Sequence, residues 1–364
     1  MSSLHTSSVS NKPRNIAATP TSVPFAYVPE IDGLRAVAIL LVLAAHTAPR
    51  LLGGVIGVDI FFVISGYLIT SILLGEFFKT GKISIKAFYL RRVLRIFPAF
   101  WFLLLCYLLL VFTVVAPERR AGHLRAILYS ATYIINWTRA YDLGSGMIGH
   151  TWSLAVEEQF YLIWPLLLSL MLLASRRNLI VLIGGLVVVA TIWHTALVLQ
   201  PDSKAWVFFG SDARAGQLLI GCLLAALPMK AVSDAAAKAW VIPVAVLAAI
   251  VIVGPESFRW LELAGSFIIA FCAAWLIAAV QSTEKTTLSR ILATGVLVAI
   301  GRLSYSLYLW HFPIILALGG RGIARANVLA VLLSLAAALF SYYVVEKPFL
   351  RLKSRSAHPA AVVA

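Results

Sequence analysis

Long apolar segments are the feature that most limits what this chain can fold into. Ten follow one another after residue 30, and most approach the roughly 20 residues that a helix needs to cross a bilayer. Because backbone groups in lipid must be hydrogen-bonded within the span, such segments form helices. The sequence therefore predicts an all-α integral membrane protein with about ten transmembrane helices. The expected spans are 34–49, 55–75, 96–116, 151–173, 179–199, 214–229, 239–254, 261–281, 293–318 and 326–346.

The positions of Lys and Arg predict how these spans are oriented. An even number of spans puts both termini on one side, and that side holds 19 of the 30 basic residues, against 10 on the other and Arg302 within a span. Basic residues collect on the cytoplasmic side of membrane proteins, so we expect cytoplasmic termini. This gives a disordered tail over 1–29, a transmembrane domain over 30–350 and a basic tail over 351–364.

The net charge of +15 is spread over short loops and does not form a basic block. Membrane lipids are therefore the expected partners of these charges, and nucleic acid is not. Cys106, Cys222 and Cys272 lie inside apolar runs at unrelated spacings. That pattern predicts buried thiols and gives no sign of a disulfide framework or a metal site.

Arg35 and His46 stand eleven residues apart in the first span. At about 100° per residue this is three turns plus roughly 20°, so both side chains share one helix face, roughly 16 Å apart along the axis. An ionisable residue at that depth is costly and usually functional. Asp59 in the second span is expected at a similar depth, where it would hydrogen-bond His46 and raise its basicity. The alternatives are a His46 ring that reaches interfacial water and an Asp59 that caps its helix.

Three arginines precede Pro98 in the predicted inner loop between spans two and three. In a helix Arg91, Arg92 and Arg95 fall within an arc of about 100° and form one cationic face. Such a face either anchors the chain beside anionic lipid or binds a cytoplasmic polyphosphate, because the guanidinium fork matches phosphate geometry. The sequence leaves both interpretations open.

Polar side chains also recur at helical spacing in the fourth span. Ser153, Glu157 and Tyr161 follow one another at intervals of four residues and therefore share a face. A carboxylate two turns into a span usually faces a cavity or a partner charge. Glu157 is therefore either a functional carboxylate or the structural partner of an intramembrane arginine.

The ninth span shows the same kind of spacing. Ser304, Tyr308 and His311 fall on one face, whereas Arg302 points about 180° away from His311 on a straight helix. The alternative for the aromatic residues around them is an interfacial belt.

Together these motifs resemble the acyltransferase 3 family of integral membrane acyltransferases. They are Arg35 and His46 in R-x10-H, GVDIFFVISGYLI from Gly57, RRVLRIFP from Arg91, WSLAVEEQFYLIWP from Trp152 and YSLYLWHFP from Tyr305. The resemblance runs from about residue 30 to 350. It implies a bacterial inner-membrane enzyme that moves an acyl group, usually acetyl, from cytoplasmic acyl-CoA to a hydroxyl of an envelope carbohydrate. Lipopolysaccharide O-antigen, exopolysaccharide and lipo-oligosaccharide are the implied acceptors.

The resemblance also suggests roles for the charged residues. Acetyl-CoA would be bound by Arg35, Arg91, Arg92 and Arg95. His46 is the implied general base, oriented by Asp59 or Glu157, and transfer is either direct or through an acyl-enzyme. Other expected site-lining residues are Ser153, Tyr161, Arg302, Ser304, Tyr308 and His311. Of these, Arg302, Ser304 and Tyr308 are the candidate hydrogen-bond donors to the developing oxyanion.

Two further expectations concern the protein as a whole. Many family members carry an extracytoplasmic hydrolase-like domain after the last span, and the chain ends at residue 364 without one. This suggests a stand-alone form that transfers directly to its acceptor or works with a separate extracytoplasmic partner protein. A secondary transporter of acyl groups or small solutes is the alternative function, although the sequence shows no convincing internal repeat.

Overall fold

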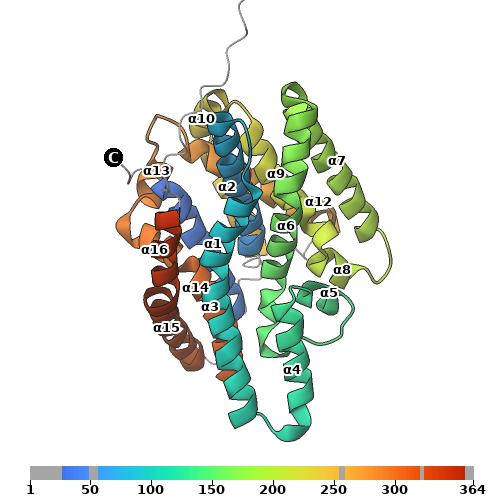
Figure 1. The fold of residues 1–364 in the computed structure, drawn as a ribbon, viewed down its shortest axis with the longest axis vertical. Helices are drawn as coiled ribbons and strands as arrows, with labels where there is room; N and C mark the ends of the chain where they lie inside the picture. The colour runs from blue at the N-terminus through green and yellow to red at the C-terminus, as the bar shows by residue number, and fades with distance from the viewer. Residues whose placement is uncertain (1–26, 49–55, 254–258, 320–323, 357–364) are drawn as a thin grey trace, which may run out of the picture.

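The computed structural model describes residues 27–48, 56–253, 259–319 and 324–356, and within these ranges every regular element is helical (Figure 1). Most of both predicted tails lies outside the described residues. The first half of the chain forms α1 (Pro29–Thr47), α2 (Ile56–Thr80), α3 (Ile85–Thr113), α4 (Pro117–Ala131), α5 (Ile135–Ala140), the 3-10 helix η2 (Gly146–Thr151), α6 (Trp152–Ala174) and α7 (Leu179–Val198). The second half forms α8 (Lys204–Phe209), α9 (Ser211–Ala226), α10 (Met229–Lys238), α11 (Val241–Val253), α12 (Arg259–Val280), α13 (Thr287–Leu292), α14 (Gly295–Ala317), α15 (Ala324–Phe340), the π-helical turn η4 (Ser341–Glu346) and α16 (Lys347–Ser356).

Each of the ten predicted spans falls on a helix of the structure, but fewer than ten have the length and hydropathy of a membrane span. In the described part of the chain six helical stretches do, or seven if the bent pair α10 and α11 is one span. Helix α1 carries Glu30, Asp32 and Arg35 within its first two turns, and α14 is interrupted by polar residues such as Arg302 and His311. The predicted count of ten therefore exceeds what these criteria support. Polar residues account for α1 and α14, whereas the apolar stretch Ala264–Val280 of α12 is shorter than a span and α11 qualifies only together with α10.

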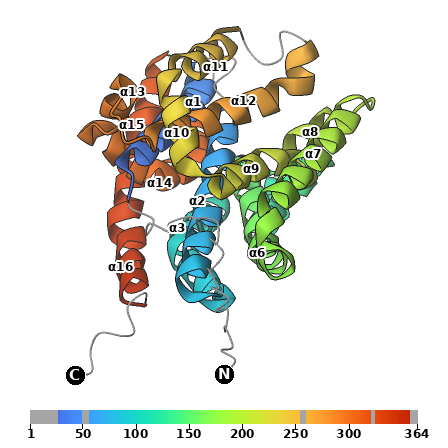
Figure 2. The same cartoon turned by 90° about the horizontal axis from the view of Figure 1, so that it is seen from above.

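The helices pack around a central group made of α1, α2, α9 and α14 (Figure 1). Helix α2 packs against α9 and α1, and α1 packs along α14. In the view from above, α7 and α8 lie on one side of this group and α13 and α15 lie on the other (Figure 2). The central helices hold buried polar residues such as Asp59, Arg214 and Ser304, while α7 and α15 present many exposed apolar side chains. This distribution suits a bundle surrounded by lipid.

Close approach of α2 and α9 depends on two glycines. A Cβ atom added to Gly66 would overlap the carbonyl oxygen of Leu218, and one added to Gly221 would overlap that of Val63. Small residues at such crossings let two membrane helices pack backbone to backbone, which lipid alone does not drive. The contact fixes the position of α2, whose opposite face supports the site described below.

We therefore predict that Gly66→Ala destabilises the protein, whereas Gly75→Ala on the same helix does not, because no atom lies within 4 Å of a Cβ at position 75. Overpacking of this kind costs about 1–3 kcal/mol. Thermal unfolding of both variants in detergent, followed by size-exclusion chromatography, measures the difference. Equal midpoints for the two variants would show that α2 and α9 can separate at no cost.

Candidate active site

A cavity of about 140 Å³ lies between α1, α2, α3, α6 and α14. Apolar side chains of α2 form much of its wall, and the other helices contribute most of the polar groups. The polar lining residues are Arg35, Ser65, Arg92, Arg95, Ser153, Glu157, Tyr161, Ser304, Tyr305 and Tyr308. The structure thus brings together eight of the residues that the sequence singled out, from four different helices.

Arginines form the basic part of this lining. The Nη2 atom of Arg35 donates a hydrogen bond to Ser304 Oγ at 3.0 Å, and its Nη1 atom lies 3.9 Å from Asp32 Oδ1. The guanidinium of Arg92 lies 4.8 Å from the centre of the Tyr161 ring. These contacts hold planar cations at the cavity wall, where a guanidinium fork can bind phosphate or carboxylate oxygens.

Glu157 lies among these cations. Its carboxylate lies near Ser65 and within electrostatic range of Arg35, Arg92 and Arg95. Ser65 in turn contacts the hydroxyl group of Tyr161, one turn further along α6. The helical face predicted for span four therefore points into the cavity, where its carboxylate offsets part of the arginine charge.

Glu346 is a second buried carboxylate near the arginines, and no motif in the sequence singles it out. It is 4% exposed, accepts a hydrogen bond from Ser306 Oγ at 2.9 Å and interacts electrostatically with Arg35 and Arg95. Its position depends on the π-helical turn η4, which shifts the register of the last helix. Such turns interrupt helices frequently at functional sites, and the residue pattern alone does not reveal them.

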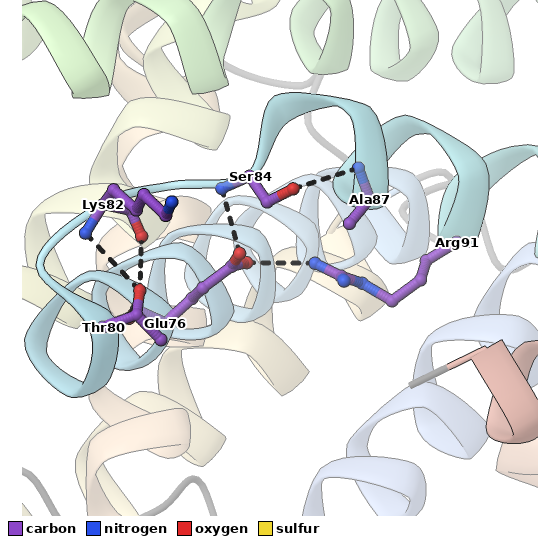
Figure 3. Close-up of polar contacts among 6 residues, drawn as sticks. All are labelled: Glu76, Thr80, Lys82, Ser84, Ala87 and Arg91. Atoms are coloured by element: carbon purple, nitrogen blue, oxygen red, sulfur yellow. Dashed lines mark hydrogen bonds and ion pairs between the residues drawn. The ribbon is translucent and has the colours of Figure 1, made fainter. Parts of the chain in front are cut away.

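Arg91 belongs to a different contact from Arg92 and Arg95. It does not line the cavity, and its Nη2 atom pairs with Glu76 Oε2 at 3.1 Å (Figure 3). The other oxygen of Glu76 accepts the backbone N–H of Ser84 at 2.9 Å (Figure 3). Arg91 therefore ties α3 to the end of α2, and the structure does not group it with the expected donor-binding residues.

Asp59 was expected beside His46, but the structure pairs it with Arg214. Its Oδ1 atom accepts a hydrogen bond from Arg214 Nη1 at 2.8 Å, and the Nε2 atom of Gln217 lies 3.4 Å away. Both charged side chains are buried, with 10% and 7% of their surface exposed. A buried carboxylate is stabilised more by a neighbouring cation than by a neutral imidazole. The ion pair between α2 and α9 therefore replaces the expected contact with His46.

Arg302 was expected as a donor to the oxyanion, but it lies outside the cavity. Its side chain is 55% exposed, its Nη2 atom donates to the Tyr27 hydroxyl at 2.9 Å and its Nε atom is 3.7 Å from Asp32 Oδ2. Helical spacing predicts that Arg302 and His311 lie on opposite faces of one helix, and the structure has the same arrangement on α14. Arg302 therefore joins the start of α1 to α14.

His46 and His311 lie beyond the cavity lining, in a cluster with a third imidazole, His150. The ring of His311 is 5.2 Å from that of His46 and 5.4 Å from that of His150, measured between ring centres. His150 was not singled out from the sequence. Its spacing of three from Ser153 and seven from Glu157 would have placed it on the same helical face. Phe312 packs on two of the rings, at 5.1 Å from His46 and 5.2 Å from His150.

Tyr308 connects the cavity to the histidine cluster. Its hydroxyl group donates to the backbone oxygen of His150 at 2.7 Å and lies 2.6 Å from Ser153 Oγ, which lines the cavity. Its ring is 5.4 Å from that of His311. The site thus has an anion-binding region of arginines, a carboxylate beside them, and a group of imidazoles next to the Tyr308 ring.

Comparison with known proteins agrees with this arrangement of motifs. The model of an acyltransferase domain family matches residues 28–346. The chain is 34% identical over 347 residues to O-acetyltransferase OatA of Staphylococcus aureus, which covers 88% of this chain and 57% of that protein. It is 34% identical over 351 residues to peptidoglycan O-acetyltransferase OatA of Listeria monocytogenes, covering 88% and 56%. The chain thus spans little more than half the length of these relatives.

No solved structure matches the chain. The family match is therefore supported by sequence, and by a structure in which the matched segments meet around one cavity. Because the family model covers nearly all of the described helices, the chain belongs to the acyltransferase 3 family of integral membrane acyltransferases.

Proposed function

We propose that the protein transfers an acyl group, with acetyl as the first candidate, from cytoplasmic acyl-CoA to a hydroxyl of a cell-envelope carbohydrate. The observation that carries this proposal is the meeting of Arg35, Arg92 and Arg95 with Glu157 in one cavity. Tyr308 of that cavity contacts the ring of His311, which lies beside the ring of His46. The names of the OatA relatives support O-acetylation, and the Listeria protein is named for peptidoglycan. For this chain we propose the broader class of envelope glycans and glycolipids as acceptors.

The arginines are the proposed binding groups for the donor. Acyl-CoA carries several phosphate groups at the end remote from its thioester, and planar guanidinium groups bind phosphate through two parallel hydrogen bonds. Arg35 and Arg92 are held in place by Ser304 and by the Tyr161 ring, so little side-chain freedom is lost when the donor binds. Lipid anchoring needs only positive charge and does not require arginines that line a cavity.

His46 is the proposed general base. Its Nδ1 atom lies 2.8 Å from the backbone oxygen of Val42, which only accepts hydrogen bonds, so Nδ1 carries the proton and Nε2 holds a lone pair. In the proposed reaction the acceptor oxygen attacks the thioester carbonyl carbon, the C–S bond breaks, and Nε2 removes the hydroxyl proton. The proton then passes to the sulfur of CoA, so acyl-CoA and alcohol give ester and free thiol. We propose direct transfer because it needs no further nucleophile.

A location in the bacterial inner membrane with both termini in the cytoplasm follows from the same proposal. It places the basic loops and the CoA on one side and the glycan on the other. A separate extracytoplasmic partner protein would act on the glycan side. The exposed apolar side chains of α7 and α15, such as Val181, Val188, Val328 and Leu332, support contact with membrane lipid.

The proposal is tested with membranes that contain the protein, acetyl-CoA labelled in the acetyl group, and envelope glycan extracted from a strain that lacks the protein. We expect label to appear in the glycan, whereas a transporter would transfer none. His46→Asn should lower the rate by about 10²-fold or more, because the amide can keep the bond to Val42 O but supplies no basic nitrogen. A His46→Asn variant that keeps most of its activity would remove His46 from the role of base.

A second prediction separates phosphate binding from lipid anchoring. Arg35→Lys should raise the KM for acetyl-CoA about tenfold and change the KM for the glycan little, because lysine keeps the charge but loses the guanidinium fork. Arg302→Lys is the matched control, since Arg302 is a charged residue of the same type outside the cavity. Arg35→Lys kinetics equal to those of the control would make Arg35 a topology determinant without a role in donor binding.

A third prediction concerns sidedness. In a background with the three native cysteines replaced by alanine, Lys82→Cys and Leu143→Cys introduce thiols at two exposed positions, in the loops that follow α2 and α5. An impermeant thiol reagent added to intact cells should label only the cysteine at position 143. Labelling of position 82, or of both positions equally, would contradict the proposed orientation.

A further inference from the structure

The three clustered histidines share one hydrogen-bonding pattern. His46 Nδ1 lies 2.8 Å from Val42 O, His311 Nδ1 lies 2.7 Å from Tyr308 O, and His150 Nε2 lies 3.0 Å from Leu309 O. A carbonyl oxygen only accepts, so each of these nitrogens must carry a proton. In the neutral ring the second nitrogen then has a lone pair and no proton. The backbone thus fixes the tautomer of all three imidazoles.

Two of the three lone-pair nitrogens, His150 Nδ1 and His311 Nε2, are fully buried and have no hydrogen-bond partner among the described residues. The side chains themselves are 4% and 0% exposed. A buried acceptor without a donor is unfavourable, so a neighbouring group that gains a proton would stabilise it by donating to it.

The proposed reaction supplies such a donor. When His46 removes a proton, its ring becomes a cation with N–H groups on both nitrogens. A partly buried cation is stabilised by lone-pair acceptors close to it, and the structure pairs the carboxylate of Asp59 with Arg214. The nearest polar ring is that of His311, 5.2 Å away between ring centres, followed by His150 beyond it at 5.4 Å from His311.

We infer that His150 and His311 are a proton reservoir for His46. This assignment rests on the proposed function. The proton leaves the acceptor oxygen, is shared among ring nitrogens of the three histidines, and ends on the sulfur of CoA when the C–S bond has broken. No proton is gained or lost overall. His150 and His311 act through His46 and are therefore positioning and proton-sharing residues. Within the described ranges no three such side chains are arranged to hold a metal ion.

The cluster also remains connected to the cavity, as a reservoir requires. The hydroxyl of Tyr308 bonds to the backbone of His150 and lies 2.6 Å from Ser153 Oγ, and both hydroxyl-bearing residues line the cavity. Phe312 packs against the rings of His46 and His150.

The test uses amide substitutions that keep each carbonyl contact and remove only the lone-pair nitrogen. His311→Asn can replace the Nδ1 donor, and His150→Gln can replace the Nε2 donor. His194 offers a matched control away from the cavity. It is 0% exposed, its Nδ1 atom lies 3.1 Å from Ala213 O, and its Nε2 atom has no partner among the described residues. His194→Asn therefore removes the same kind of nitrogen from the same kind of site.

We expect His311→Asn and His150→Gln to lower kcat for transfer from labelled acetyl-CoA to extracted envelope glycan by about 10- to 100-fold, a part of the effect of the base itself. The KM for acetyl-CoA should stay within about twofold, and the solvent deuterium isotope effect on kcat should increase. His194→Asn should match the natural protein. All variants are compared by size-exclusion chromatography, and if one histidine variant fails to fold, the other decides.

Two outcomes are distinguishable. If the natural protein transfers no label, the proposed function fails and the reservoir fails with it. If the natural protein transfers label and a folded His311→Asn or His150→Gln variant keeps its kcat and isotope effect, only the reservoir is overturned. The same holds if His194→Asn loses as much activity as the cluster variants, because the loss would then reflect general packing.

Discussion

Charge buried within an apolar helix bundle is the constraint on which the rest of this structure depends. Each buried ion needs a partner, because solvation by lipid or by apolar side chains is weak. Asp59 is paired with Arg214, Glu30 with Lys285, and Arg35 with Ser304 and Asp32. The contacts of Asp59 with Arg214 and of Arg35 with Ser304 join helices that are far apart in sequence, so such partners also determine which helices are neighbours.

Close backbone contact complements these polar contacts. Gly66 and Gly221 let α2 and α9 approach, and Gly301 on α14 lies so near Asp32 O that a Cβ there would overlap it. The second contact brings α1 against α14. Arg35 and His46 both face α14, one beside Ser304 and the other beside His311 and Phe312. The glycines therefore help to build the site without taking part in its chemistry.

The sequence predicted the faces of helices better than the contacts between them. Spacing alone put Ser153, Glu157 and Tyr161 on one face, and it separated Arg302 from His311, because helical periodicity is a local property. Partners of buried charges are not local. Asp59 pairs with a residue 155 positions away, which no spacing rule indicates. The number of spans was not confirmed either, because six or seven helical stretches among the described residues have the length and hydropathy of a span, against the ten predicted.

Arg91 and Glu346 are two further residues whose contacts the sequence motifs do not predict. Arg91 shares a short basic motif with Arg92 and Arg95, yet Glu76 at the end of α2 holds it apart from the cavity. Glu346 lies in a motif typical of the end of the last transmembrane helix. A π-helical turn nevertheless places its carboxylate within electrostatic range of Arg35 and Arg95. Both outcomes depend on tertiary neighbours or on a change of helical register, and neither can be seen in the order of residues.

Helix α1 has a further consequence, because it carries a basic residue and an imidazole on one rigid rod. With a rise of 1.5 Å per residue, eleven residues set about 16 Å between the level of Arg35 and that of His46. Under the proposed function the helix would act as a ruler: a donor held by its phosphates at one end could react only if its flexible arm were long enough to reach the other. Removing one turn would keep the shared face but shorten the ruler by about 5 Å. Length, as well as charge, would then select the donor.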